Sequence, residues 1–258
     1  MTGAPGSLTL TALCGVPEVA PGSDLAALLA AALHSCGLTL RADDVLVVAQ
    51  KIVSKAEGRY VALDSIRAQA RALELAGITG KDALLVELIL AESSEVLRAK
   101  RDVLIVRHRL GFVMANAGID RSNVPAAAGG ERVLLLPQDP DRSAAGLRAA
   151  LGARCGVMPG IIISDSFGRA WRRGVVNVAI GAAGLNSLIN RRGERDRGGR
   201  ALEVTEVAHA DAIAAAAALA MGEAAEGTPA VLVRGLESRG PETPAAALIR
   251  PLAEDLFR

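Results

Sequence analysis

The sequence predicts an α+β fold, with mixed rather than strictly alternating α/β order, along its 258 residues. Three short, continuous apolar runs, 45–48, 161–163 and 230–233, are typical of buried strands. The stretch 210–221 is rich in alanine, which favours a helix, and it is too short to span a membrane. It is therefore typical of a buried helix. Since strand and helix patterns do not alternate regularly, we do not expect a clean doubly wound sheet.

The first half of the chain begins with a loosely alternating strand. Pro17 and Pro21 then break the chain, and Ser23-Asp24 opens an Ala/Leu-rich helix that continues to about Cys36. The buried strand 45–48 follows, and a polar segment comes directly after it. The expected elements of this half are strands at 8–13, 45–48, 102–106, 110–116 and 134–136, and helices at 23–36, 62–76 and 82–99.

The second half opens with an Asp-Pro-Asp cap and a helix over about 139–151. The strand 161–163 is expected to deliver Ser164, Asp165 and Ser166 at its carboxyl end. The expected elements that follow are a strand at 175–180, an arginine- and glycine-rich loop or hairpin tip at 191–200, an alternating stretch at 202–207, a helix at 210–221, a strand at 230–233 and a helix at 244–257. The prediction is a single unit over 1–258, with a subdomain boundary, if there is one, near 125–160.

Composition excludes several classes of function. There are 29 Lys and Arg against 28 Asp and Glu, and only 2% of residues are aromatic, so neither a cationic nucleic-acid surface nor a base-stacking platform is expected. The three cysteines are far apart and lack metal-binding spacing, which fits a protein of the reducing cytoplasm. No basic leader precedes an apolar run, and no membrane association is expected.

Phosphate-binding motifs of the common kinds are absent from the sequence. The nearest approach to a P-loop ends in Gly80-Lys81-Asp82, where the required hydroxyl residue is missing. No GxGxxG follows a strand, and GxSxG is absent. Any nucleotide site must therefore have another design.

Two polar segments interrupt the apolar pattern in the first half. In 50–59, Lys51 and Lys55 would share one face of a helix and could bind phosphate oxygens, although an exposed turn with solvated lysines would look the same. In 110–124, Asp120 and Asn123 follow a glycine and could hold a cation or a ribose; an Asx turn that satisfies its own backbone is the alternative.

A third segment, 163–174, places Asp165 and Ser166 directly before arginines and Trp171. Carboxylate and hydroxyl oxygens suit Mg²⁺ or Mn²⁺, and guanidinium groups suit the phosphate oxygens bound to such an ion. A solvated loop is the alternative. The five arginines of 191–200 form a separate cationic cluster, which we expect either to help hold an anionic acceptor or to be solvated.

Together these segments resemble the coenzyme F420-0:L-glutamate ligases, also called F420 gamma-glutamyl ligases, in their stand-alone form without the C-terminal reductase domain. The resemblance extends in order over nearly the whole chain. Its matching stretches are VVAQKIVSKAEGR (47–59), RLGFVMANAGIDRSNV (109–124), LLPQDPDRSA (135–144), ISDSFGRAWRRG (163–174), AIGAAGL (179–185) and MGEAAEGTPAVLVRG (221–235).

The resemblance implies a cytoplasmic, homodimeric, GTP-dependent amide ligase of coenzyme F420 biosynthesis. Such an enzyme joins L-glutamate to the carboxylate of coenzyme F420-0 through an acyl phosphate, releases GDP and phosphate, and can add further γ-linked glutamates. It also implies two divalent ions, Mg²⁺ or Mn²⁺, with K⁺ as a further candidate cation. Asp120 and Asp165 are implied as ligands of one divalent ion, Ser166 and Glu223 as ligands of the other, and Asp165 and Lys55 as catalytic residues.

The nucleotide contacts implied by the resemblance come from four parts of the chain, and those of Val16 and Pro17 would be made through the backbone. They are Val16, Pro17, Glu18, Val19, Gln50, Lys55, Asn123, Met221, Gly222, Glu223, Ala224, Ala225, Glu226, Gly227 and Thr228. The chain departs from relatives at Gln50 (often Ser), Ser166 (Thr) and Asn190 (often Asp); the last concerns the acceptor side.

Two other functions remain open at this point. One is a ligase of the same fold that glutamylates another carboxylate acceptor, which would share every nucleotide and metal residue. The other is a non-catalytic nucleotide-binding protein, which loss of an acidic ligand would favour; however, Asp120, Asp165 and Glu223 are all present.

Overall fold

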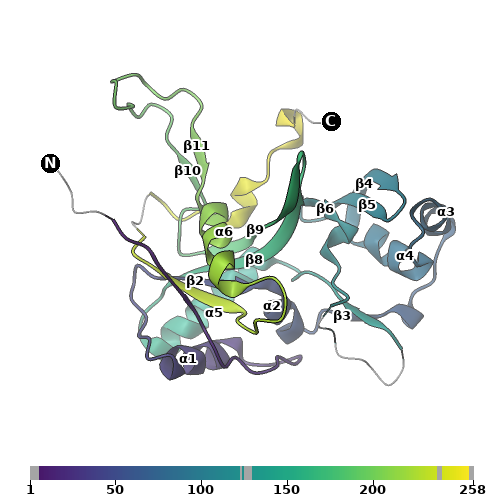
Figure 1. The fold of residues 1–258 in the computed structure, drawn as a ribbon, viewed down its shortest axis with the longest axis horizontal. Coiled ribbons are helices and arrows are strands. Elements are labelled where there is room, and N and C mark those ends of the chain that lie inside the picture. Colours follow the sequence, from purple (N-terminus) through teal and green to yellow (C-terminus); the bar gives the residue numbers. More distant parts are fainter. Residues whose placement is uncertain (1–5, 123, 125–129, 237–239, 256–258) are drawn as a thin grey trace.

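The computed structural model describes residues 6–122, 124, 130–236 and 240–255 and is centred on a five-stranded mixed sheet (Figure 1). The strand order is β1-β12-β2-β8-β9; β2 and β8 are parallel, and the other neighbouring pairs are antiparallel. The strands are β1 Thr9–Ala12, β12 Ala230–Arg234, β2 Val45–Ala49, β8 Gly160–Arg169 and β9 Arg172–Ala183. The predicted α+β class is confirmed, and the apolar runs form the central strands.

Helices cover both faces of this sheet, and the alternation of side chains along β8 divides the core between them. Ile161 and Ile163 pack on one face with residues of α1 (Leu25–Ser35), α2 (Gln50–Ala56) and α5 (Pro140–Cys155). Ile162 packs on the other face against α6 (His209–Met221), whose small alanines allow close approach to the strands. The predicted helices 23–36, 139–151 and 210–221 are thereby confirmed.

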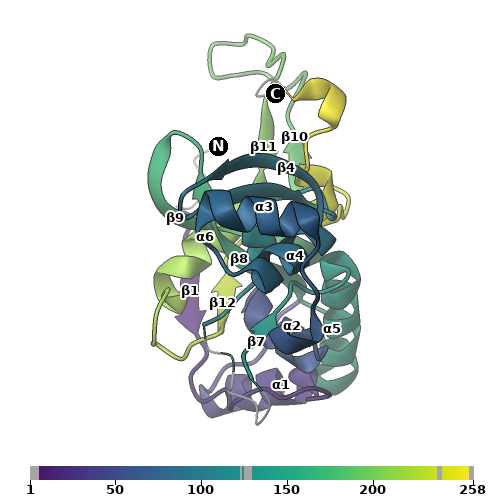
Figure 2. The same cartoon turned by 90° about the vertical axis from the view of Figure 1, so that its right-hand side faces the viewer.

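A separate lobe, seen end-on in Figure 2, is built from the chain between α2 and α5. It has its own apolar core, whose members run from Leu63 to Leu135. Its elements are β3 Tyr60–Ala62, η1 Leu63–Ser65, α3 Ala70–Thr79, α4 Ala83–Ala91, β4 Ser93–Lys100, β5 Val103–His108, β6 Val113–Ala115, η2 Asn116–Gly118 and β7 Arg132–Leu134. The proposed subdomain boundary stays a prediction.

Two predicted helices of this lobe are wrong in part. The predicted helix 62–76 is a short 3₁₀ turn followed by α3, because Tyr60–Ala62 pairs with β7 and draws the start of the segment into a sheet. The predicted helix 82–99 ends at Ala91, and its second half is β4, which pairs with β5. Strand pairing supplies backbone hydrogen bonds that outweigh the modest helix propensity of 93–100.

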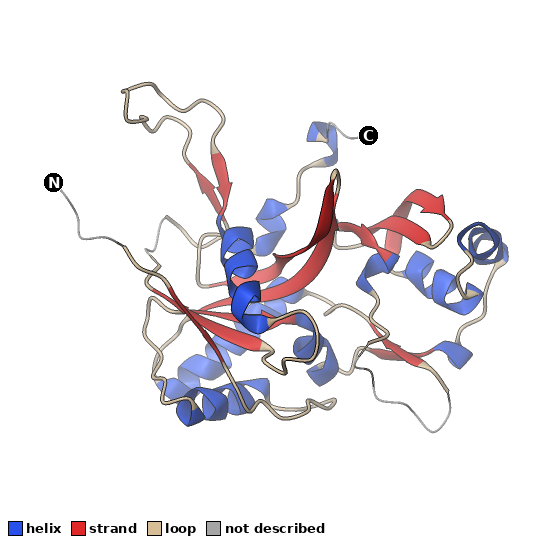
Figure 3. Cartoon of the chain, viewed as in Figure 1, coloured by secondary structure: helices blue, strands red, loops and turns tan. Residues whose placement is uncertain are grey.

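The sheet β10 (Leu188–Asn190) and β11 (Glu206–Ala208) forms a hairpin that projects from the body, as Figures 1 and 3 show. Its tip contains 191–200, as predicted. The predicted final helix 244–257 is wrong over the described residues, which hold only the 3₁₀ turns η3 Ala245–Leu248 and η4 Leu252–Glu254. Pro251 explains the break, because proline disfavours helical backbone at the residue before it.

The most consequential difference concerns β8. The expected strand 161–163 continues to Arg169, so Ser164, Asp165 and Ser166 lie within a strand and not after one. The polar residues are tolerated because β9 pairs with this stretch along its length, with Ser166 opposite Asn177. Trp171, at the turn between the two strands, is 91% exposed.

Candidate functional site

A cavity of about 590 Å³ lies where several strands of the central sheet begin or end. β1 ends at Ala12 beside β12, β12 begins at Ala230 beside the end of β2, and β2 ends at Ala49 beside Ser164 of β8. Beyond Ser164, the edge of β8 on the β2 side has no strand partner among the described residues, because the chain of β2 turns into α2. Crevices at the carboxyl ends of strands are common ligand sites in open α/β sheets.

This arrangement brings together four segments that the sequence analysis selected separately. The residues selected there that line the cavity are Val16, Pro17, Glu18, Val19, Gln50, Lys51, Lys55, Asp165, Ser166, Met221, Gly222, Glu223, Ala224, Ala225, Glu226, Gly227 and Thr228. Asp120 is adjacent through contacts with α2, and Asn123 lies outside the described residues. Their roles toward a nucleotide or a metal stay predictions.

The helix α2 carries both lysines of the first polar segment, so the helical alternative for 50–56 is the correct one. Lys55 is 6% exposed, and its Nζ lies 2.5 Å from Oε1 of Glu18. Lys51 Nζ lies 3.3 Å from Oδ2 of Asp120, to which Gln50 Nε2 also donates at 3.0 Å. Both cations therefore face carboxylates at the cavity.

Asp120 is held in place by two backbone hydrogen bonds of 2.9 Å with Leu134. Its carboxylate acts on Asp165, whose pKa is raised to about 7, first by burial and then by the charge of Asp120, with a smaller contribution from Glu223. A backbone hydrogen bond from Ser166 and the charge of Lys51 oppose this shift. Two neighbouring carboxylates thus disfavour the charged form of Asp165, and an added positive charge would relieve this repulsion.

The loop after α6 is a closed turn on the opposite side of the cavity. Thr228 Oγ1 donates to Met221 O at 2.6 Å, and the backbone amide of Ala224 donates to Glu226 at 2.8 Å. Gly222 has φ +77° and ψ 172°, a backbone conformation that residues with a side chain rarely adopt, so the turn requires glycine there. The turn presents Glu223 to Asn177, whose Nδ2 lies 2.5 Å from Glu223 Oε1.

The acidic residues do not form a ready-made metal cage. Within the described ranges, no group of three or more His, Cys, Asp or Glu side chains could hold an ion. The predicted ligands instead form two pairs, and Mg²⁺ commonly takes only one or two carboxylates, with phosphate oxygens and waters completing its shell. Together with the mutual repulsion at Asp165, this donor set fits divalent ions that arrive with a nucleotide.

Sequence reasoning missed two buried polar residues of the cavity wall, Ser164 and Asn177, and also the exposed Ser122. Ser164 was named only as part of its segment, and Asn177 was read as part of an apolar strand. The available signal was the same for both, a buried polar residue inside an apolar strand, which requires a partner.

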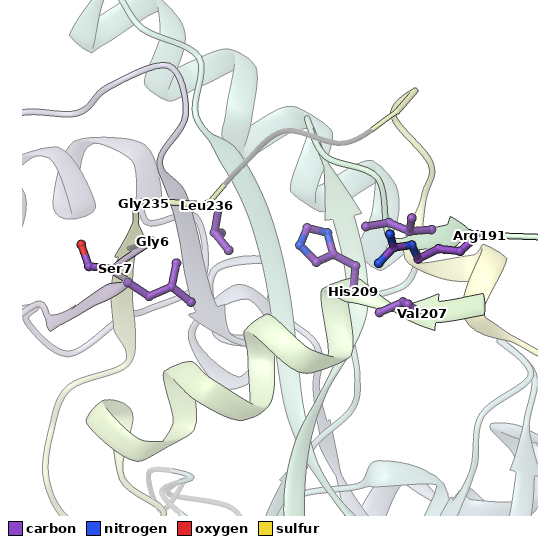
Figure 4. Close-up of a pocket in the computed structure, with 9 residues that line it drawn as sticks. Gly6, Ser7, Arg191, Val207, His209, Gly235 and Leu236 are labelled. Atoms are coloured by element: carbon purple, nitrogen blue, oxygen red, sulfur yellow. The ribbon is translucent and has the colours of Figure 1, made fainter. Parts of the chain in front are cut away.

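The arginine cluster of 191–200 lies on the projecting hairpin, away from this cavity. Arg191 pairs with Glu194, and Arg192 pairs with Glu206. Arg191 also borders a second cavity of about 310 Å³ at the base of the hairpin, with His209 in the middle of its lining (Figure 4). That the cluster binds the acceptor stays a prediction.

No helix in the part of the chain that the structure describes is long and apolar enough to cross a membrane. A mixed sheet with carboxylates, hydroxyls and two lysines around a cavity at its strand ends defines an α+β protein with a site for a small polar ligand. The model of the F420-0:Gamma-glutamyl ligase family matches residues 15–235, and the chain belongs to this family.

Curated relatives agree with this assignment over almost the full length of both chains. The Coenzyme F420:L-glutamate ligase of Methanothermobacter thermautotrophicus is 46% identical over 97% of this chain and 99% of its own. The proteins of the same name from Methanopyrus kandleri and Archaeoglobus fulgidus are 47% and 43% identical, over 93% and 95% of this chain and 94% of each of theirs. The resemblance inferred from the sequence motifs is thereby confirmed.

Proposed function

We propose that this protein is a GTP-dependent amide ligase that adds L-glutamate to coenzyme F420-0, and can extend the product through further γ-linked glutamates, in coenzyme F420 biosynthesis. The observation that carries the proposal is the convergence of 16–19, α2, β8 and 221–228 on one cavity that contains both cations and carboxylates. The names of the curated relatives supply the acceptor and the amino acid.

The proposed reaction has two steps. A carboxylate oxygen of the acceptor attacks the γ-phosphorus of GTP, the bond to the β-phosphate oxygen breaks, and GDP leaves. The amine of glutamate then attacks the carbonyl carbon of the acyl phosphate, loses a proton, and displaces phosphate. Because phosphoryl transfer depends mainly on positioning and on stabilising spread negative charge, a site of this type needs cations more than it needs a protein nucleophile.

The chain supplies these requirements from opposite sides of the cavity. Lys55, nearly buried, would exchange Glu18 for a phosphate oxygen, which is a usual role for lysine. Asp120 and Asp165 would hold one divalent ion, and Ser166 and Glu223 the other. When bound, Mg²⁺ or Mn²⁺ would neutralise phosphate charge and align the reacting oxygens.

Ligation can be tested directly by product mass. Purified protein is incubated with GTP, Mn²⁺, L-glutamate and F420-0, and the mass of the acceptor is followed; each added glutamate gives one discrete increment. Omission of GTP or glutamate, and replacement of GTP by ATP, serve as controls. GDP release without any glutamylated F420-0 would exclude this acceptor and favour another carboxylate, whereas neither GDP nor product would favour the non-catalytic alternative.

The remaining expectations of the family resemblance are part of the same proposal. A homodimer would show twice the chain mass in light scattering. A role for K⁺ can be tested by replacing it with a bulky organic cation at constant Mn²⁺ concentration. Lower ligase turnover would support K⁺ as an additional cation.

A further inference from the structure

Two side chains of the cavity wall have no part in the proposal above, although both are buried and polar. Ser164 is 1% exposed, and its hydroxyl has no hydrogen-bond partner among the described residues. Asn177 is 5% exposed and donates to Glu223 at 2.5 Å. Buried polar atoms without partners are uncommon in folded proteins, so the Ser164 hydroxyl requires an explanation.

Strand geometry places these residues on one side of the sheet. Residues two apart in a strand face the same way, so Ser164 and Ser166 point to one face of β8. In the antiparallel register, Ser166 lies opposite Asn177 and Ser164 lies opposite Ala179. Asp165 points to the other face, so the two predicted cation sites lie on opposite sides of the same strand.

The contact between Asn177 and Glu223 joins a rigid element to a turn. Asn177 lies within β9, paired along its length with β8, whereas Glu223 belongs to the irregular stretch after α6. The amide donates to a carboxylate, and such charge-assisted hydrogen bonds are short and directional. One carboxylate oxygen of Glu223 is thereby fixed at the strand, and the other is left available to the cavity.

We propose that Asn177 is a positioning residue that holds Glu223 as a ligand for the second divalent ion, and that Ser164 donates its hydroxyl hydrogen to a phosphate oxygen bound with that ion. This inference rests on the proposed function and extends it to two residues. An unpartnered hydroxyl donor and an oriented carboxylate are complementary to a cation–phosphate pair. The carboxylate of Glu223 would bind the cation, and the hydroxyl of Ser164 would donate to the phosphate.

The two residues make different predictions, which can be measured without turnover. Mn²⁺ affinity is measured by electron paramagnetic resonance in the presence of GDP, and GDP affinity by calorimetry at saturating Mn²⁺. Asn177→Ala should weaken Mn²⁺ binding about 10- to 100-fold, the usual effect of removing a residue that orients a metal ligand. Ser164→Ala should weaken GDP binding by about tenfold or more, as expected for a lost hydrogen bond to a charged group.

A double-mutant cycle separates positioning from a general effect on the site. If Asn177 acts through Glu223, then Asn177→Ala should have little additional effect on Mn²⁺ affinity in a Glu223→Gln background. Additive losses would overturn that role. Gln69→Ala, at an exposed amide residue of the separate lobe, is the matched control and should bind Mn²⁺ like the wild type.

Thermal melting in chelator distinguishes these roles from structural ones. Ser164→Ala removes an unsatisfied buried hydroxyl, so the metal-free variant should melt no lower than the wild type while GDP binds more weakly. If the Asn177→Ala variant melts at a lower temperature but binds Mn²⁺ normally, Asn177 has only a structural role and the inference about it is overturned. Unchanged GDP affinity in the Ser164→Ala variant would overturn the inference about Ser164. If the wild type binds neither Mn²⁺ nor GDP, the proposed function itself fails.

Discussion

Replacing Asp165 by Asn should stabilise the metal-free protein while abolishing most of its activity. The pKa of Asp165 is raised to about 7, by burial first and by the charge of Asp120 second. An unfolded chain carries aspartate with a pKa near 3.9. Folding therefore works against ionisation of this carboxyl. The contribution of Asp165 to stability should be most favourable below about pH 4, should fall as the pH rises to about 7, and should be constant above that.

The size of the effect follows from the shift. Raising the pKa from 3.8 to about 7 corresponds to roughly 4 kcal/mol at 1.36 kcal/mol per unit, as an upper bound. Because Asp165 borders a water-accessible cavity and opposing charges relax, we expect about 2 kcal/mol at pH 8. For a chain of this size that corresponds to an increase in melting temperature of about 4–8 °C in the Asn variant.

The assay is thermal unfolding of both proteins with excess chelator between pH 4 and pH 8, followed by the same measurement with Mn²⁺ and GDP. The wild type should lose stability across this range relative to Asp165→Asn, and Mn²⁺ should stabilise the wild type more. Ligase turnover should fall at least about 10²-fold in the variant, if the bound metal contributes several kcal/mol to the transition state. Parallel pH curves in chelator, or near-wild-type turnover, would refute the reasoning.

Three other predictions concern different parts of the molecule. Lys55→Met should raise the KM for GTP by roughly tenfold or more, because a nearly buried cation at the cavity would be lost, and steady-state kinetics will show it. The pKa of Glu92 is lowered first by His108, whose Nε2 lies 3.6 Å from Glu92 Oε2, and also by Arg109, whose Nε donates to it at 3.2 Å. Glu92 should therefore stabilise the fold above about pH 4 and lose that effect as the pH falls through its folded pKa; chemical denaturation of Glu92→Gln should show about 1–3 kcal/mol less stability at pH 7 and a flatter acid limb. Trp171, the only tryptophan and 91% exposed, should give red-shifted fluorescence that acrylamide quenches readily, and Trp171→Ala should change stability by no more than about 0.5 kcal/mol.

Much of the sheet could be predicted because its central strands are continuous apolar runs. The runs at 45–48, 161–163 and 230–233 became β2, β8 and β12, which are adjacent in the sheet. Short runs rich in valine and isoleucine favour a strand buried on both faces over a segment of buried helix. The segments of the site could also be selected from the sequence, because polar residues there interrupt otherwise apolar stretches.

The parts that could not be predicted depend on contacts between distant residues. The stretch 93–100 has no strand pattern of its own and becomes β4 only because β5 pairs with it. The strand at 161–163 was expected to end before Ser164, because the pairing of 164–169 with β9 cannot be read from local composition. The contact of Glu18 with Lys55 joins residues 37 apart, and no spacing rule predicts it.

The cavity is formed from groups that the chain leaves unsatisfied on its own. The charges of Asp120 and Glu223 act on Asp165. Among the residues that the structure describes, the hydroxyl of Ser164 has no hydrogen-bond partner, and Lys55 pairs with Glu18, whose side chain is 71% exposed. The arrangements at Asp165 and Ser164 reduce the stability of the ligand-free protein, and the ion pair of Lys55 can be replaced by another anion. A cation bound together with a phosphate would make all three arrangements more favourable. In natural proteins, buried polar and charged groups without suitable partners occur mainly at functional sites. The same residues that make the metal-free fold less stable are therefore the ones by which a metal–nucleotide ligand would be recognised, and stability in chelator and affinity for Mn²⁺ should change in opposite directions when Asp165 is replaced.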